Sequence, residues 1–338
     1  MTAPAQSAIG AGPRDVSVVI PTWNGGARFR EVLLALSSQD LAGGFELVVI
    51  DSGSRDGTAE AAAQAGALVE KIPQAEFNHG ATRNRAIARS SGRLVALLTQ
   101  DAVPIGPSYL SNLVRPFANP RVDGVYARQF PRPDCDPLLA ERLRRWSASR
   151  AEPLLQVFAP GDPAASRRLY ERLPPIERYL SSVFDNVASA VRRASWERIN
   201  FPARSFGEDV AWGREVLLSG GAIAFEPTAE VEHSHRLRLW REFQRIYCDH
   251  RNLYELFGLH QVRSWAAVRE GWAHQRAFYR EILAAQRLTR REALLWRALS
   301  IPHALLETAA QFLGARSHWK TAESRFWRWA DGRIRRGV

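Results

Sequence analysis

The sequence has few cysteines and lacks the motifs that thiol chemistry needs. Only Cys135 and Cys248 occur among its 338 residues, far apart and without a Cys-x-x-Cys pair. We therefore expect neither a disulfide framework nor a thiolate metal site, and a reducing compartment fits. Residues 1–14 also lack the basic start and apolar block of a signal peptide, so we expect a loose tail there and a protein that works in the cytosol.

Two common nucleotide-binding motifs are absent as well. The first expected strand-to-helix turn contains Gly25 and Gly26 but no Gly-x-Gly-x-x-Gly, and no Gly-x-x-x-x-Gly-Lys-Ser/Thr occurs anywhere. These absences weigh against a dinucleotide-binding fingerprint and against a P-loop.

The first two thirds of the chain carry no net charge. Residues 236–338 hold 20 Lys and Arg against 9 Asp and Glu, a net of +11, which leaves 26 against 26 in residues 1–235. The same C-terminal third contains seven of the eleven tryptophans. Basic residues among aromatic ones suit either nucleic acid or an anionic membrane surface.

No run of the C-terminal third is apolar enough to be a convincing membrane span. Residues 294–313 are apolar but contain Arg297 and Glu307, so we expect an interfacial or core helix there. The last residues place Trp319, Phe326 and Ile334 near one helical face among several arginines, and we expect this tail to lie on a membrane. A packed helix with a solvated basic face is the alternative.

The N-terminal part alternates between strand and helix patterns. Apolar runs at 16–20 and 45–50 read as buried parallel strands, and residues 27–39 between them have a helical period. An alanine-rich helix follows Thr58, so the chain opens as a right-handed β-α-β-α unit whose polar loops gather at one edge of the sheet. Asp51, at a strand end, is a candidate for contact with a nucleotide's base or ribose, or a turn-forming residue in an Asx motif.

Residues 76–104 combine a helix start, a strand and an acidic loop. Asn78, His79 and Gly80 open a helix with Arg83 in its first turn, where free N–H groups and a cation predict a place for an anion. Residues 94–98 read as a strand that ends in Thr99-Gln100-Asp101. Open α/β sheets bind ligands at such strand ends, so we expect a metal-bound phosphate there.

The remaining part of this half is less regular. We expect a helix at 109–117, strands at 122–127 and 222–225, and a helix at 210–219 that begins after Glu208 and Asp209. Residues 131–178 are rich in Pro, Asp and Arg with one possible helix at 138–146. They are either a disordered insertion or a mobile loop over a bound donor, and we favour the mobile loop.

Four motifs together resemble the family 2 glycosyltransferases of the GT-A fold, and among these the bacterial rhamnosyltransferases of surface polysaccharide synthesis. They are Pro21-Thr22-x-Asn24, Asp51-Ser52-x-Ser54-x-Asp56-Gly57-Thr58, Phe77-Asn78-His79-Gly80-x-Thr82-Arg83-Asn84 and Thr99-Gln100-Asp101-Ala102. The resemblance covers residues 16 to about 235. It implies an α/β fold with a Rossmann-like, mostly parallel sheet flanked by helices, followed here by a helical C-terminal region.

The resemblance also implies a nucleotide-sugar site and a divalent cation, Mg²⁺ or Mn²⁺. The residues matched to donor binding are Pro21, Thr22, Asn24, Asp51, Ser52, Asp56, His79, Gly80, Arg83, Gln100 and Asp101. The family's usual metal motif is Asp-x-Asp, whereas Thr99 occupies its first position here, so Asp101 is the only carboxylate and free metal should bind weakly. His233 is implied as a second ligand; His235 is expected to point to the opposite face of an extended segment.

On the acceptor side the resemblance implies Asn186 and Ser189 near the sugar, although an ordinary buried strand is an equal alternative. It assigns the base to Asp209, with Glu208 positioning it or the acceptor, because one carboxylate must reach the acceptor hydroxyl opposite the leaving diphosphate. Trp212, on the same helix face, is expected to form an apolar wall for a sugar ring.

The resulting hypothesis is an inverting, metal-dependent transferase at residues 15–235 with a basic helical region at 236–338. It would move L-rhamnose from dTDP-L-rhamnose to a lipid-linked or polysaccharide acceptor at the inner face of the cell membrane, without binding nucleic acid. A UDP-hexose donor and a non-catalytic nucleotide-sugar binding protein are the alternatives.

Overall fold

The structure is a computed structural model and describes residues 9, 14–235 and 238–337. The chain divides into two compact units. The sheet unit comprises residues up to Arg132, Arg145–Arg172 and Leu180–Ser234, and the helical unit comprises Pro133–Arg144, Leu173–Tyr179 and the residues from His235 onward. Most of the tail expected at 1–14 lies outside the described residues, but Ile9 is buried and bridges Phe45.

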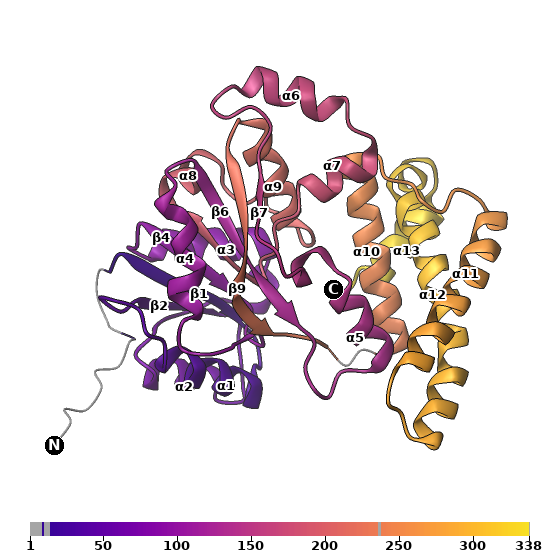
Figure 1. Ribbon diagram of the computed structural model, residues 1–338, viewed down its shortest axis with the longest axis horizontal. Helices are drawn as coiled ribbons and strands as arrows, with labels where there is room; N and C mark the ends of the chain where they lie inside the picture. Colours follow the sequence, from indigo (N-terminus) through magenta and orange to yellow (C-terminus); the bar gives the residue numbers. More distant parts are fainter. Residues whose placement is uncertain (1–8, 10–13, 236–237, 338) are drawn as a thin grey trace. The chain divides into compact units, whose positions relative to one another are not determined.

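One mixed sheet forms the centre of the sheet unit (Figure 1). Its strands run in the order β3-β2-β1-β4-β8-β6-β9-β5, with β7 paired to β9. Their bounds are β1 Val16–Thr22, β2 Glu46–Asp51, β3 Leu68–Lys71, β4 Leu94–Leu98, β5 Val103–Pro104, β6 Val122–Phe130, β7 Leu154–Gln156, β8 Ala188–Arg192 and β9 Ala222–Glu232.

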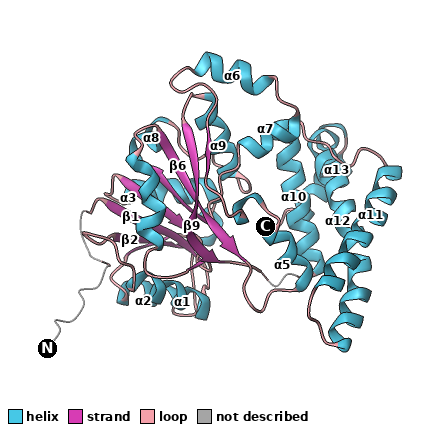
Figure 2. Cartoon of the chain, in the orientation of Figure 1, coloured by secondary structure: helices cyan, strands magenta, loops and turns pink. Residues whose placement is uncertain are grey.

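Strands β1 to β4 are parallel, as the alternation of strand and helix patterns predicts. β1 and β2 are buried along nearly their whole length, because helices cover both faces of the sheet (Figure 2). β8 then runs antiparallel between β4 and β6, and β6 is parallel to β9. The polar ends of β1, β2 and β4 therefore share one edge.

The helices of the sheet unit are mostly short. Their bounds are α1 Gly26–Ser37, α2 Thr58–Gln64, α3 His79–Arg89, α4 Tyr109–Val114, α6 Pro163–Glu171, α8 Arg193–Arg198 and α9 Glu208–Leu218, with 3-10 turns at Gln74–Glu76, Arg115–Ala118 and Ser147–Ser149. One face of the sheet buries apolar side chains of α1 and α4, including Phe29, Leu36 and Leu110.

The helical unit contains α5 Pro137–Arg144, most of α7 Pro175–Ser181, α10 Leu239–Phe257, α11 Trp265–Ala285, α12 Arg290–Glu323 and α13 Arg325–Ile334. Tyr279, Ile282 and Leu283 of α11 pack against Leu138 of α5 and Ala304 of α12. None of the helices in the described part of the chain has the length and apolar character of a membrane-spanning segment.

Two expectations about local structure were wrong. Residues 131–178 do not form one irregular loop: α5 matches the helix expected at 138–146, but α6 and β7 also lie within this segment and α7 begins there. The tail is not one continuous helical face either. Trp319 belongs to α12 and packs against Tyr254 and His260, whereas Phe326 lies on α13 and is 64% exposed.

Candidate active site

The loops after β1 and β2 are joined by hydrogen bonds. The Asn24 N–H donates to Ser54 Oγ over 2.7 Å, and Asn24 Oδ1 accepts from the Arg55 N–H over 2.9 Å. Asn24 has a φ of 47°, a left-handed backbone that asparagine tolerates better than most residues. The Pro21-Thr22-x-Asn24 motif thus fixes a turn between two strand ends.

Asp51 lies at the centre of this junction and is 1% exposed. Its carboxylate accepts hydrogen bonds from the Thr22 and Ser54 hydroxyls over 3.0 and 2.5 Å, and from the Gly53 and Ser54 N–H groups. This is the Asx arrangement that the sequence left open. Ser52 donates its hydroxyl to the Thr22 carbonyl. A contact between these residues and a nucleoside stays a prediction.

Asp56 and Gln100 complete the edge. Asp56 accepts from the Gly26 N–H over 2.9 Å and from Thr58, and the Thr58 hydroxyl lowers the pKa of this carboxyl. Gln100 bonds both backbone groups of Trp23, whose side chain is 47% exposed. Trp23 was not predicted as a site residue from the sequence, although its position between Thr22 and Asn24, inside the first motif, indicated that it could be one.

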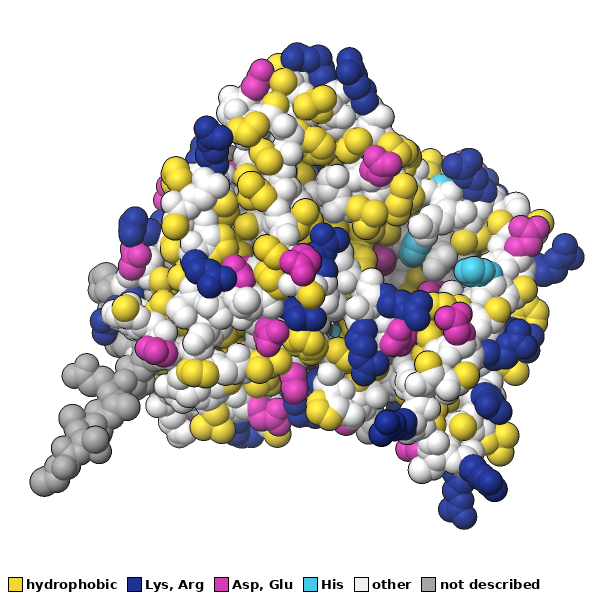
Figure 3. Space-filling view, in the orientation of Figure 1, with side chains coloured by type: hydrophobic (Ala, Val, Ile, Leu, Met, Phe, Trp, Pro, Cys, Tyr) yellow, Lys and Arg dark blue, Asp and Glu magenta, His cyan; other side chains and the backbone are white. Residues whose placement is uncertain are grey.

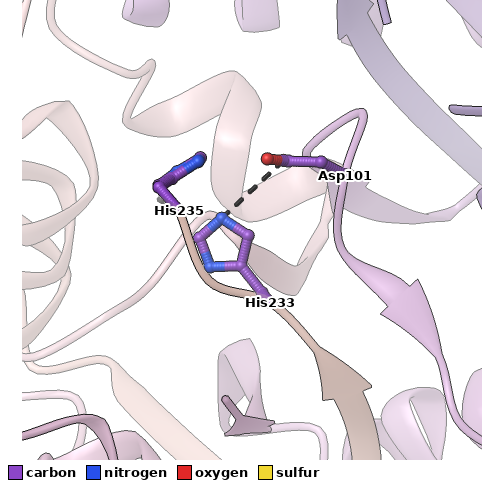
Figure 4. A group of neighbouring side chains, drawn as sticks. All are labelled: Asp101, His233 and His235. Atoms are coloured by element: carbon purple, nitrogen blue, oxygen red, sulfur yellow. Dashed lines mark ion pairs between the residues drawn. The ribbon is translucent and has the colours of Figure 1, made fainter. Parts of the chain in front are cut away.

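Asp101 and His233 lie close together because of strand pairing. β5 follows Asp101 and pairs antiparallel with the end of β9, with Val103 opposite Glu232. His233 comes next and donates its N–H to the Phe130 carbonyl at the end of β6. As a result His233 Nε2 lies 3.7 Å from Asp101 Oδ1 (Figure 4).

His235 joins this pair, contrary to the expectation that it points away. In an extended segment the side chains of residues two apart point to the same face, so the expectation had misapplied strand alternation. Ligand atoms of Asp101, His233 and His235 all lie within 4.8 Å of one another (Figure 4). One carboxylate and two imidazoles within this span fit a divalent cation that also takes oxygen ligands from a substrate.

The acidic pair at the start of α9 is held in a buried network. Glu208 Oε1 accepts from Arg83 Nη1 over 2.6 Å, and both side chains are about 5% exposed. Asn186 Nδ2 donates to the same oxygen over 3.3 Å, and the Ser189 hydroxyl donates to Asn186 Oδ1. The Glu208 carboxylate is therefore occupied by hydrogen bonds within the protein, and Asp209 is the more accessible of the two carboxylates.

Asp209 and Asp101 are linked through two residues of one loop. Asp209 Oδ2 accepts from the Asn186 N–H over 3.2 Å, and the carbonyl of the next residue, Val187, accepts from the Thr99 N–H over 3.0 Å. Thr99 is two residues before Asp101. The loop before β8 thus ties the expected base to the strand end that carries the expected metal ligand.

A third carboxylate lies beside Asp209 and was missed from the sequence. Asp185 accepts from Gln129 Nε2 over 2.6 Å and from the Val187 N–H over 3.0 Å, and the Trp146 side chain also hydrogen-bonds to it. Burial, reinforced by the negative charges of Glu208 and Asp185, raises the pKa of Asp209 well above its usual range. In the sequence, only its position immediately before Asn186 indicated that Asp185 could lie near the acceptor side of the site.

The structure does not support the sugar contacts expected of Trp212, Asn186 and Ser189. Trp212 is 0% exposed, packs against Phe184 and Phe201, and donates its indole N–H to the Ile199 carbonyl. Asn186 and Ser189 are 1% and 0% exposed. Ser189 lies on β8, the buried strand that was the alternative, and together with Asn186 in the loop before it supports Glu208, whereas Trp212 belongs to the core.

The start of α3 also differs from the expected anion site. The Asn78 side chain accepts from the Ala81 N–H, the Asn78 carbonyl accepts from the Thr82 N–H, and the Gly80 N–H faces the Arg204 carbonyl at 3.5 Å. His79 lies beside Arg83, with their nitrogens 3.5 Å apart. Arg83 is engaged with Glu208, so its contact with a diphosphate, like those of His79 and Gly80, stays a prediction.

The fold and these motifs agree with comparisons to known proteins. A model of the family described as glycosyl transferase family 2 matches residues 17–197. The chain belongs to this family.

Two relatives match along most of the chain. The chain is 30% identical to the O-antigen chain rhamnosyltransferase RfbN of Salmonella typhimurium over 314 residues, which is 90% of each chain. It is also 30% identical to the O-antigen chain rhamnosyltransferase WbaN of Salmonella anatum over 311 residues, again 90% of each. The protein is therefore a glycosyltransferase of family 2.

A solved structure supports the GT-A fold. The mannosyltransferase PcManGT of Pyrobaculum calidifontis, in complex with GDP-Man and Mn²⁺, superposes with a TM-score of 0.51 and 18% identity, over 96% of this chain and 85% of that one. At this identity the likeness concerns the fold.

Proposed function

We propose that this glycosyltransferase transfers L-rhamnose from dTDP-L-rhamnose, with inversion, to a lipid-linked or polysaccharide acceptor in surface-glycan synthesis. The choice of sugar is supported by the two O-antigen rhamnosyltransferases that match along nearly the whole chain. The observation that carries the mechanism is the loop of residues 185–187, which bonds Asp209 at one residue and the backbone of Thr99 at the next.

Asp209 accepts the acceptor hydroxyl's proton as that oxygen forms a bond to the anomeric carbon. The bond from the anomeric carbon to the diphosphate breaks, and the nucleoside diphosphate leaves with the electron pair. Because its pKa is raised, Asp209 is a stronger base than an exposed aspartate. Glu208, fixed by Arg83 and Asn186, holds the start of α9 and so orients Asp209.

Asp101 and His233, joined by His235, would hold the divalent cation, Mg²⁺ or Mn²⁺. Such a cation supplies positive charge that stabilises the departing diphosphate. The donor's nucleoside would contact the edge formed by Thr22, Asn24 and Asp51, with Trp23 exposed beside it.

Replacing Asp209 with Asn tests this assignment. The amide keeps the size of the side chain and its oxygen acceptor but cannot take a proton, so we expect transfer to fall by about 100-fold or more. Donor binding, measured as the rise in melting temperature with dTDP-L-rhamnose and Mn²⁺, should persist. Retained turnover would refute the role of Asp209.

The same melting assay separates the donors. A ligand that binds only the folded state raises the melting temperature, so dTDP-rhamnose should exceed UDP- and GDP-sugars when metal is present. A larger rise with a UDP-hexose would replace the proposed donor and leave the mechanism intact. Absence of both transfer and metal-stimulated donor hydrolysis would favour a non-catalytic binding protein.

We place the enzyme at the inner face of the cell membrane, as a peripheral protein. Two features support this: the net charge of +11 in residues 236–338, and Phe326 and Trp329, which are 64% and 62% exposed on α13. Arg325 and Arg328 are exposed on the same helix. Anionic lipids attract such a surface, and aromatic side chains favour the interface.

A further inference from the structure

A hollow between α11 and α12 is lined by three arginines, a serine and an isoleucine. It has a volume of about 240 Å³, and its lining residues are Arg276, Arg280, Arg297, Ser300 and Ile301. The first two arginines are one helical turn apart on α11, and the others come from α12. No acidic residue lines the hollow.

These three arginines differ from others of the helical unit in their partners. Arg142 pairs with Glu242 and Glu307, and Arg251 pairs with Glu255 and Asp331. Within the described residues, by contrast, no ion pair is formed by Arg276, Arg280 or Arg297. Arg276 lies 5.2 Å above the ring of Trp272, whose indole N–H donates to the Ile301 carbonyl. Three like charges around one hollow repel each other unless an anion joins them.

An apolar stripe on α12 runs beside the hollow. Leu294, Ile301 and Leu305 are 73%, 42% and 44% exposed, and their spacing of seven and four residues puts them on one helical face. In Figure 3 basic side chains gather over α11 and α12. Guanidinium groups next to exposed alkyl side chains match a molecule with an anionic head and hydrocarbon tails. A nucleic-acid backbone would leave the alkyl groups in water.

We propose that this hollow binds the phosphate of an anionic membrane lipid, with Leu294, Ile301 and Leu305 in contact with the acyl region. The proposal rests on the peripheral membrane location given above and specifies the site: the phosphate is bound by α11 and α12, and α13 adds contacts of its own. The face that carries the hollow is then the face that lies on the bilayer.

The test compares two charge-matched triple variants of the full chain by flotation on vesicles. One is Arg276→Gln with Arg280→Gln and Arg297→Gln. The control is Arg121→Gln with Arg167→Gln and Arg172→Gln, which removes the same charge from exposed sites of the sheet unit. On vesicles of phosphatidylglycerol and phosphatidylcholine we expect the first variant to bind about 100-fold more weakly than the wild type, and the control to bind nearly as well.

Equal binding by the two variants would overturn the proposal. A second result would also overturn it. If millimolar inorganic phosphate alone raises the melting temperature of the wild type but not of the first variant, and that variant still binds vesicles, the site binds a free anion and not a lipid. The Asp209→Asn variant should float like the wild type, since flotation needs no turnover. Failure of the transferase mechanism and failure of the docking site therefore give different results.

Discussion

At the scale of single residues, the charge next to Asp209 should set the enzyme's pH dependence. Two negatively charged groups act on Asp209: Glu208 on the same helix, which is itself paired with Arg83 of α3, and Asp185 on the loop before β8. The raised pKa of Asp209 means that the base loses its proton only at a higher pH than an ordinary aspartate. Transfer should therefore fall as the pH drops through that raised value.

Asp185→Asn removes one of the two negative charges that raise this pKa. The acid limb of kcat/KM should shift to lower pH, because Asp209 then loses its proton more easily. The amide still accepts from the Val187 N–H, and Gln129 can rotate to offer its oxygen, so the loop should keep its shape. Asp162→Asn, at the exposed cap of α6, is the matched control and should leave the profile unchanged. An unshifted acid limb in Asp185→Asn would exclude an electrostatic role for Asp185.

The positions of some site residues could be predicted from the sequence, and those of others could not. Asp101 and His233 were predicted as neighbours, and β5 with β9 brings them together. Trp212 was wrongly predicted to contact a sugar. Helical spacing shows which residues lie on the same helix face, but not whether that face is exposed to solvent. The rings of Phe184 and Phe201 and the missing Cβ of Gly124 make the tryptophan's pocket, and they come from different elements of the fold.

At the scale of elements, the packing of α3 against the loop before α9 requires a glycine. A Cβ on Gly80 would lie 1.9 Å from the Pro202 carbonyl oxygen, a backbone atom that cannot turn away. Gly80→Ala should therefore lower the free energy of unfolding by about 1–3 kcal/mol, although alanine favours helices. Gly332 lies in α13 with nothing within 4 Å of its Cβ position, so Gly332→Ala should raise it by about 0.5–1 kcal/mol. Urea denaturation of both variants measures the two effects, and a stabilised Gly80→Ala would show that the close approach is absent.

Elements with a clear apolar pattern could be predicted from sequence, whereas α6, α7, β5 and β7 could not. β1, β2 and β4 are buried apolar runs bounded by polar turns, so their pattern is local. α6 and α7 begin at Pro163 and Pro175, and such prolines indicate a loop when read without context, although proline is also favoured in a helix's first turn. β5 and β7 have two and three residues, and only their pairing with β9 makes them strands.

At the scale of the whole molecule, charge is segregated along the chain. Residues 1–235 carry no net charge, and the metal and donor site expected within them depends on a few fixed groups. The excess of +11 belongs to residues 236–338, whose exposed side chains include Phe326, Trp329 and the stripe on α12. Two kinds of binding with different responses to salt should therefore coexist in one protein.

Salt should weaken membrane binding far more than donor binding. The screening length falls from about 10 Å at 0.1 M salt to about 3 Å at 1 M, which removes most of the attraction between exposed arginines and anionic lipid. Flotation on phosphatidylglycerol vesicles should thus drop by about tenfold or more across this range. The melting-temperature rise with dTDP-L-rhamnose and Mn²⁺ should change much less, because Asp101, His233 and Asp51 are at least partly buried and short-range contacts are screened less. If vesicle binding instead persists at 1 M salt, insertion of Phe326, Trp329 and Leu294 holds the protein on the bilayer, and the arginines contribute little.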